Sequence, residues 1–130
     1  HRFHFPLAGR VSETRLLNGP LYSVNPIALR RNLSYLWENR RTLTPLETEK
    51  SGTVLLLEIG ATNVGSIVQT YQPGTMVAKG DEKGYFRFGG SSTLLLFEPG
   101  RVRLADDLIE QSRNQTELYA RVGDRLGTAA

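Results

Sequence analysis

The chain contains no cysteine and only two histidines, both within its first four residues. The lack of cysteine excludes disulfides, thiolate nucleophiles and cysteine-ligated metal sites. Two histidines are too few for a three-histidine metal site, and no metal centre is expected. No apolar run approaches the roughly 20 residues that a membrane-spanning helix needs, and the run Val54–Leu57 belongs to a predicted strand.

Composition and charge are those of an ordinary globular domain. Apolar residues make up 39% of the 130 residues and charged residues 22%, which is typical of a folded chain. A chain of this length can bury a core, and there is no internal repeat, linker or low-complexity stretch, so we expect one domain over residues 1–130. The net charge of +3 slightly favours an anionic surface or substrate but is too small for a nucleic-acid-binding protein.

Turn residues between short apolar stretches predict an α+β domain rich in short antiparallel strands, arranged as a sandwich or barrel, with helices near the C-terminus. Residues 3–24 are expected to form short strands and turns. The later strands are predicted over Thr53–Ile59, Asn63–Tyr71, Thr75–Ala78, Tyr85–Phe88 and Thr93–Glu98. Helices are predicted over Ala105–Arg113 and Thr116–Leu126, the second one ending at Gly127.

A further helix is predicted to begin at Asn25-Pro26, because asparagine is a good cap and proline fits the first helical position. Apolar residues follow at helical spacing from Ile27 to Trp37, among arginines at positions 30, 31, 40 and 41. A surface helix with an apolar underside explains this pattern. A basic, apolar-edged element that contacts lipid headgroups explains it too. The sequence leaves both interpretations open.

The segment Gly89-Gly90-Ser91-Ser92 interrupts two predicted strands and is the first candidate for chemistry. On composition alone it is explained by a glycine turn or bulge. A glycine before a serine, however, leaves the carbonyl between them unhindered and allows a strained backbone. Attack by a serine hydroxyl on its own preceding peptide carbonyl needs both properties.

The two histidines, His1 and His4, are the second candidate. Histidine is the natural base for activating a hydroxyl near neutral pH. In a strand these two positions point to opposite faces, whereas in a turn they can converge. Taken alone, the pair is also explained as two surface residues without a catalytic role. The carboxylates are scattered along the chain and identify no catalytic pair, as with Glu58, Asp81, Glu82 and Glu98.

Five blocks that follow one another in order resemble the phosphatidylserine decarboxylase family, from the first residue to about Gly127. They are His1-Arg-Phe-His-Phe-Pro6, Leu21-Tyr-Ser-Val-Asn-Pro26, Gly60-Ala-Thr-Asn-Val-Gly-Ser-Ile67, Lys79-Gly-Asp-Glu-Lys-Gly-Tyr-Phe86 and Gly89-Gly-Ser-Ser-Thr-Leu-Leu-Leu-Phe-Glu-Pro-Gly100. The resemblance implies a proenzyme that cuts itself between Gly90 and Ser91. Residues 1–90 would then belong to the β chain and residues 91–130 to the α chain. Ser91 is chosen over Ser92 because it lies at the family's spacing before Phe97.

The resemblance also implies the cofactor and the roles of the site residues. Ser91 would become a covalent pyruvoyl group that forms a Schiff base with the substrate amine and accepts the electrons released by decarboxylation. His4 would be the base for self-cleavage, and His1 would assist decarboxylation or protonate the product. No separately bound cofactor is needed, which fits the absence of a phosphate-loop or dinucleotide motif.

The implied reaction converts phosphatidylserine to phosphatidylethanolamine in a protein bound peripherally to a membrane. The implied partners are therefore phosphatidylserine, an anionic membrane surface, the protein's own cleaved chains and a second copy in a homodimer. The family's aspartate before the His-x-x-His block has no counterpart, because the chain begins at His1. Since such an acid orients the histidine, we expect an N-terminally truncated catalytic domain whose processing is slow or absent unless another acid substitutes.

Three alternatives differ from this hypothesis. A family member could decarboxylate a free amino acid such as tryptophan, because the Gly-Gly-Ser-Ser segment builds the cofactor and does not select the substrate. An inactive truncated relative would keep the motifs without the activity. A biotin or lipoate carrier is disfavoured, because its lysine stands beside methionine or aspartate at a hairpin tip and the segment Val77–Asp81 contains no such tripeptide.

Overall fold

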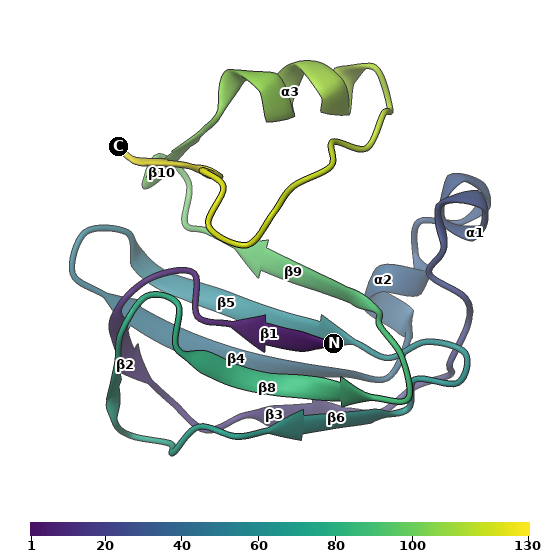
Figure 1. The fold of residues 1–130 in the computed structure, drawn as a ribbon, viewed down its shortest axis with the longest axis horizontal. Helices are drawn as coiled ribbons and strands as arrows, with labels where there is room; N and C mark the ends of the chain where they lie inside the picture. Colours follow the sequence, from purple (N-terminus) through teal and green to yellow (C-terminus); the bar gives the residue numbers. More distant parts are fainter.

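The computed structural model describes all residues from 1 to 130, and its main feature is two antiparallel sheets that face each other (Figure 1). The larger sheet has the order β7-β2-β4-β5-β9, with β3 also paired to β4. Its strands are β2 (Gly9–Val11), β3 (Arg15–Leu17), β4 (Arg41–Thr48), β5 (Gly52–Ile59), β7 (Met76–Val77) and β9 (Ser92–Leu96). The smaller sheet has the order β1-β8-β6 and consists of β1 (Arg2–His4), β6 (Ser66–Gln69) and β8 (Glu82–Arg87).

The rest of the chain adds a hairpin and three short helices. Strands β10 (Val102–Leu104) and β11 (Gly127–Ala129) pair only with each other and lie near helix α3 (Asp106–Arg113), above β9 in Figure 1. Helices α1 (Pro26–Arg31) and α2 (Tyr35–Glu38) are at one edge of the molecule. None of these helices is long and apolar enough to cross a bilayer. The predicted α+β class with antiparallel strands is confirmed, and the sheets do not close into a barrel.

The core lies between the sheets and is built by alternating side chains. Val54 and Leu56 on β5, Leu46 on β4 and Val11 on β2 are almost fully buried, together with Phe5, which follows β1. Each such side chain contributes about 1.5–3 kcal/mol by leaving water. A second cluster packs Phe3, Ala61, Val64 and Phe86 under the smaller sheet. The two clusters hold β1 and β8 against β5.

The strands predicted after Thr53 are present with shifted ends. Strand β6 is shorter than the predicted Asn63–Tyr71, because a turn occupies its start and Asn63 has a left-handed φ of 64°. Strand β8 begins at Glu82, earlier than predicted, because it pairs with β1. Strand β4 is not among the predicted strands; it contains a proline at position 45 and buried threonines at positions 42 and 44.

The predicted cap at Asn25 is confirmed, since its Oδ1 accepts a hydrogen bond of 2.8 Å from the Ala28 amide and Pro26 opens the helix. The helix stops at Arg31, however, and a second short helix follows. Neither helix contains a buried residue. Ile27, Leu33 and Trp37 are more than half exposed, so the segment has no buried apolar underside.

The predicted helix over Thr116–Leu126 is wrong, whereas the one over Ala105–Arg113 is confirmed as α3 with Ala105 as its cap. Gln115 adopts a left-handed φ of 54°, which ends α3, and the Thr116 amide closes the last turn on the Gln111 carbonyl. Residues beyond it are drawn out because Gly127 pairs with Leu104 in the β10–β11 hairpin. Gly127 therefore belongs to a strand and does not end a helix.

Candidate active site

Ser91 directly precedes β9, which is the edge strand of the larger sheet. The register pairs Ser92 with Ile59 and Thr93 with Glu58, so Ser91 lies just beyond the end of β5. Its Oγ is buried and is the one buried side-chain polar atom of the chain without a hydrogen-bond partner. Leaving a buried hydroxyl without a partner destabilises the fold by about 1–3 kcal/mol. The position of this hydroxyl is therefore better explained by a function than by a contribution to stability.

The backbone before Ser91 has an unusual conformation. Phe88 has a φ of 64° and Gly89 a φ of 127°. A left-handed φ is costly for a bulky residue, about 1–3 kcal/mol, and the side chain of Phe88 gains nothing from packing because it is 83% exposed. The segment is therefore a strained turn that ends at the Gly90–Ser91 bond.

His1 lies against Gly90, on the other side of this bond. The His1 carbonyl accepts a hydrogen bond of 2.8 Å from the Phe86 amide, which fixes its backbone to β8. Its imidazole, with Nδ1 nearest, occupies the space that a side chain at position 90 would need. Only glycine fits at this position. The predicted approach of a histidine to the glycine–serine segment is thus present for His1.

His4 follows the alternation of β1 and is exposed, with Glu82 as its partner on β8. A hydrogen bond from the Thr70 hydroxyl holds the pKa of the Glu82 carboxyl below its usual value, and the Arg2 guanidinium acts in the same direction. These contacts fix β1 to β8 at the position of His4. Neither His4 nor His1 makes a hydrogen bond to the Ser91 hydroxyl, and it is His1 that lies against Gly90.

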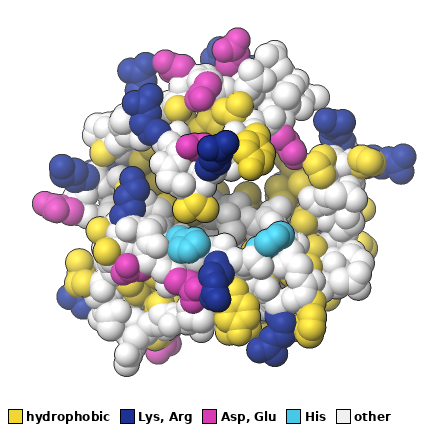
Figure 2. All heavy atoms as spheres, viewed as in Figure 1, with side chains coloured by type: hydrophobic (Ala, Val, Ile, Leu, Met, Phe, Trp, Pro, Cys, Tyr) yellow, Lys and Arg dark blue, Asp and Glu magenta, His cyan; other side chains and the backbone are white.

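Ser91, His1 and His4 all line one cavity of about 640 Å³, a volume typical of small-molecule sites. Figure 2 shows a hollow on this face of the molecule with the two histidines beside it. The inward face of β9 contributes residues at every second position, and the loop before β11 also borders the cavity. Its apolar lining includes Phe3, Phe5, Leu56, Leu95, Phe97 and Val122.

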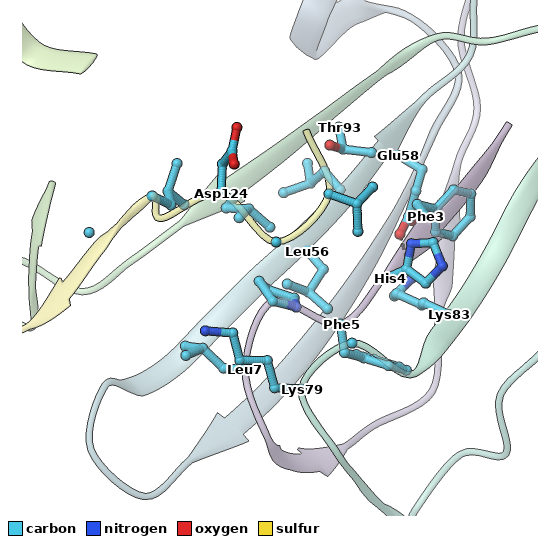
Figure 3. A pocket seen from close by; sticks show the side chains of 18 of the residues that line it. Phe3, His4, Phe5, Leu7, Leu56, Glu58, Lys79, Lys83, Thr93 and Asp124 are labelled. Carbon is cyan, nitrogen blue, oxygen red and sulfur yellow. Dashed lines mark hydrogen bonds and ion pairs between the residues drawn. The ribbon is translucent and has the colours of Figure 1, made fainter. Parts of the chain in front are cut away.

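A buried ion pair between Glu58 and Lys83 also lines this cavity, and the sequence did not predict it. The Lys83 Nζ lies 2.6 Å from Glu58 Oε1, and the two side chains are 1% and 3% exposed. In Figure 3 these side chains lie together with Phe3 at one end of the cavity, while the segment with Asp124 passes the other. Burial lowers the pKa of the Lys83 amine, and the Glu58 carboxylate offsets part of this effect.

One signal in the sequence could have drawn attention to this pair. Glu58 is the only charged residue in the otherwise apolar strand predicted over Thr53–Ile59. A charge on a buried strand needs a partner, because an isolated buried carboxylate is very costly. The partner itself could not be identified, since several lysines and arginines were equally available.

The arrangement at the Gly90–Ser91 bond contains several groups that acyl transfer requires. It combines an unpartnered hydroxyl, an unhindered glycine carbonyl, a strained preceding turn and an imidazole in contact with the glycine. A nucleophile and a base that border the same cavity are candidates for nucleophilic chemistry. The structure contains no group of three or more side chains suited to hold a metal ion.

Comparison with known proteins gives a consistent result. The sequence model of the family described as "Phosphatidylserine decarboxylase" matches residues 1–128. The chain is 52% identical over 127 residues to the phosphatidylserine decarboxylase proenzyme of Chlamydia pneumoniae. It is 50% identical over 127 residues to the proenzymes of Chlamydia muridarum and Chlamydia felis. In each case the match covers 98% of this chain and 42% of the relative, so the chain spans less than half the length of these proteins.

Proposed function

Since the chain belongs to the phosphatidylserine decarboxylase family, we propose that it is the catalytic part of a self-cleaving, pyruvoyl-dependent decarboxylase of phosphatidylserine. The observation that carries this proposal is the buried, unpartnered hydroxyl of Ser91 beside the contact between His1 and Gly90. A buried hydroxyl without a hydrogen-bond partner at the border of a cavity is available to attack. The adjacent glycine carbonyl is the electrophile within reach.

The proposed self-cleavage proceeds in two steps. The Ser91 Oγ loses its proton to a histidine and attacks the Gly90 carbonyl carbon. The C–N bond between the two residues then breaks, and the amine of residue 91 takes up a proton. An ester now joins residues 90 and 91. Removal of the α-proton of residue 91 then expels the Gly90 carboxylate and leaves a dehydroalanine. Addition of water and loss of ammonia convert this residue to a pyruvoyl group.

The residues around Ser91 are compatible with a pyruvoyl group at position 91. A pyruvoyl group there would supply a carbonyl that accepts the electrons of the broken carbon–carbon bond during decarboxylation. The apolar part of the cavity wall favours a reaction in which a carboxylate loses its charge. The imidazoles of His1 and His4 border the same cavity and can hold or deliver a proton there.

The positions of the two histidines bear on the roles proposed for them. The sequence-based assignment made His4 the base for self-cleavage and His1 the helper in decarboxylation. The contact of His1 with Gly90 supports the reverse division, in which His1 activates Ser91 and His4 serves the decarboxylation. Both divisions are tested by the alanine variants described in the Discussion.

The test of the proposed function is the intact mass of the protein in the form that its gene encodes. We expect two fragments separated at Gly90–Ser91, with the C-terminal fragment gaining the mass of one added carbonyl reagent. Vesicles containing phosphatidylserine should then yield phosphatidylethanolamine. A single uncleaved mass contradicts the proposal, and activity on free tryptophan but not on vesicles supports the alternative substrate.

We also propose that α1 and α2 contact an anionic membrane surface. Ile27 is 67% exposed and Trp37 54% exposed, and the basic side chains of Arg30 and Arg31 end α1. Exposed apolar side chains beside arginines suit the interface of a bilayer with anionic headgroups. Such a surface would hold the protein at a bilayer that contains its lipid substrate.

Replacing both Ile27 and Trp37 with serine is expected to weaken binding to anionic vesicles by about tenfold or more, because each side chain contributes up to about 1.5–3 kcal/mol when buried. Flotation of liposomes measures this change. Met76→Ser is the control, since Met76 is 65% exposed on β7 and should not affect binding. Equal flotation of the double variant and the control contradicts a membrane contact through these helices.

A further inference from the structure

Lys83 reaches the interior because of an irregularity in the smaller sheet. The register pairs Phe3 with Gly84 and His4 with Glu82, so Lys83 has no partner on β1 and is the extra residue of a β-bulge. In a regular strand it would share the outer face with Tyr85, which Arg2 covers. The bulge turns Lys83 inward instead, as bulges near active sites commonly do.

The inward Lys83 joins the two sheets. Its Nζ donates hydrogen bonds to Glu58 Oε1 on β5 at 2.6 Å and to Gln69 Oε1 on β6 at 2.8 Å. The Thr42 hydroxyl on β4 donates to Glu58 Oε2 at 2.5 Å. The ammonium also lies 5.4 Å from the centre of the Phe3 ring on β1. One charged pair thereby links five strands of the two sheets: β8 and β5, which carry it, and β6, β4 and β1, which contact it.

The stability of the fold alone does not explain the presence of this buried ion pair. Taking two charges out of water costs several kcal/mol per ion, and well-packed apolar residues often replace such pairs without loss. The position of the pair suggests another reason. Strand β8, which carries Lys83, pairs with the histidine strand β1, and β5, which carries Glu58, pairs with β9.

The pair is also close to Ser91 along the sheet. Glu58 is the cross-strand partner of Thr93, and Thr93 is two residues from Ser91, about 7 Å along an extended strand. Both Glu58 and Lys83 border the cavity that contains Ser91 and the histidines. The distance between the histidine strand and the serine strand is therefore bridged by one buried interaction.

We propose that Lys83 and Glu58 are positioning residues, whose ion pair sets the separation between His1 on one sheet and the Gly90–Ser91 bond on the other. Neither residue touches the reacting atoms. The predicted effect of the ion pair on the rate of cleavage rests on the proposed self-cleavage. The predicted effect of the ion pair on the position of β1 can be tested without that reaction.

The first test measures the rate of self-cleavage by intact mass in the protein as its gene encodes it. The double variant Lys83→Met with Glu58→Leu should fold, because it leaves no unpaired charge, and should cleave about 10²-fold more slowly, the usual effect of a misplacement near 1 Å. Cleavage of the folded double variant at the wild-type rate overturns the proposal.

The second test measures hydrogen exchange of the Phe86 amide, which donates to the His1 carbonyl. Exchange should be at least about tenfold faster in the double variant, because β1 loses its fixed position. Asp106→Asn, which removes the exposed Arg103–Asp106 pair, should change neither exchange nor cleavage. If the wild-type protein does not cleave, the proposed function is wrong. If the exchange of the Phe86 amide is the same in the double variant as in the wild type, the positioning role is wrong, whatever the result for cleavage.

Discussion

Replacing Ser91 with alanine is expected to abolish self-cleavage completely and to leave a single uncleaved protein. The variant has no hydroxyl at position 91 to attack the Gly90 carbonyl. Without cleavage no carbonyl group forms at position 91, so the protein should also fail to react with a carbonyl reagent. Intact mass before and after treatment measures both effects on one sample.

Ser92→Ala is the matched control for this prediction. Ser92 is the first residue of β9 and pairs with Ile59, so its loss should leave the rate of cleavage within about twofold of the wild type. Ser91→Ala should not destabilise the precursor, because it removes a buried hydroxyl that has no partner, which favours folding by about 1 kcal/mol. Cleavage of Ser91→Ala, or loss of cleavage only in Ser92→Ala, contradicts the choice of nucleophile.

The strands that carry Ser91 could be predicted because the information for them is local. The apolar runs over Thr53–Ile59 and Thr93–Glu98 are bounded by turn residues, and they became the neighbouring strands β5 and β9. The small residues before Ser91 indicated a turn that could tolerate strain. The same pattern could not show that the hydroxyl would be buried without a partner, because that depends on what packs around it.

The features that the sequence did not predict depend on contacts between distant residues. Glu58 and Lys83 are separated by 25 positions, and the bulge that turns Lys83 inward exists only when β8 pairs with β1. Strand β4 is stable because it pairs along its whole length with β5. Pro45 disfavours a strand at this place in the sequence, and the pairing with β5 outweighs that effect.

The wrong helix prediction over residues 116–126 also results from contacts between distant residues. Here those contacts prevent a predicted element instead of creating one that was not predicted. The local pattern favoured a helix, but Gln115 turns the chain and the β10–β11 pairing draws the segment across the cavity. This extended path gives the cavity one of its walls, including Val122. A helix in this place would have been locally acceptable and would have built a different site.

Replacing His1 with alanine is expected to slow self-cleavage by about 10²–10⁴-fold, the usual contribution of a general base. The imidazole of His1 contacts Gly90, and no other titratable side chain takes this place. His4→Ala should cleave within about tenfold of the wild type, because His4 pairs with Glu82 on the strand beside it and does not contact Gly90. The time course of the intact mass distinguishes the two variants.

Gly90→Ala provides an independent check of the same contact. Its added methyl group would overlap the His1 imidazole, so the ring must move away and cleavage should slow as it does in His1→Ala. The double variant His1→Ala with Gly90→Ala should then be little slower than either single variant, because both changes remove one interaction. If His4→Ala abolishes cleavage while His1→Ala retains it, the sequence-based assignment of His4 as the base is correct and the contact with His1 has another purpose.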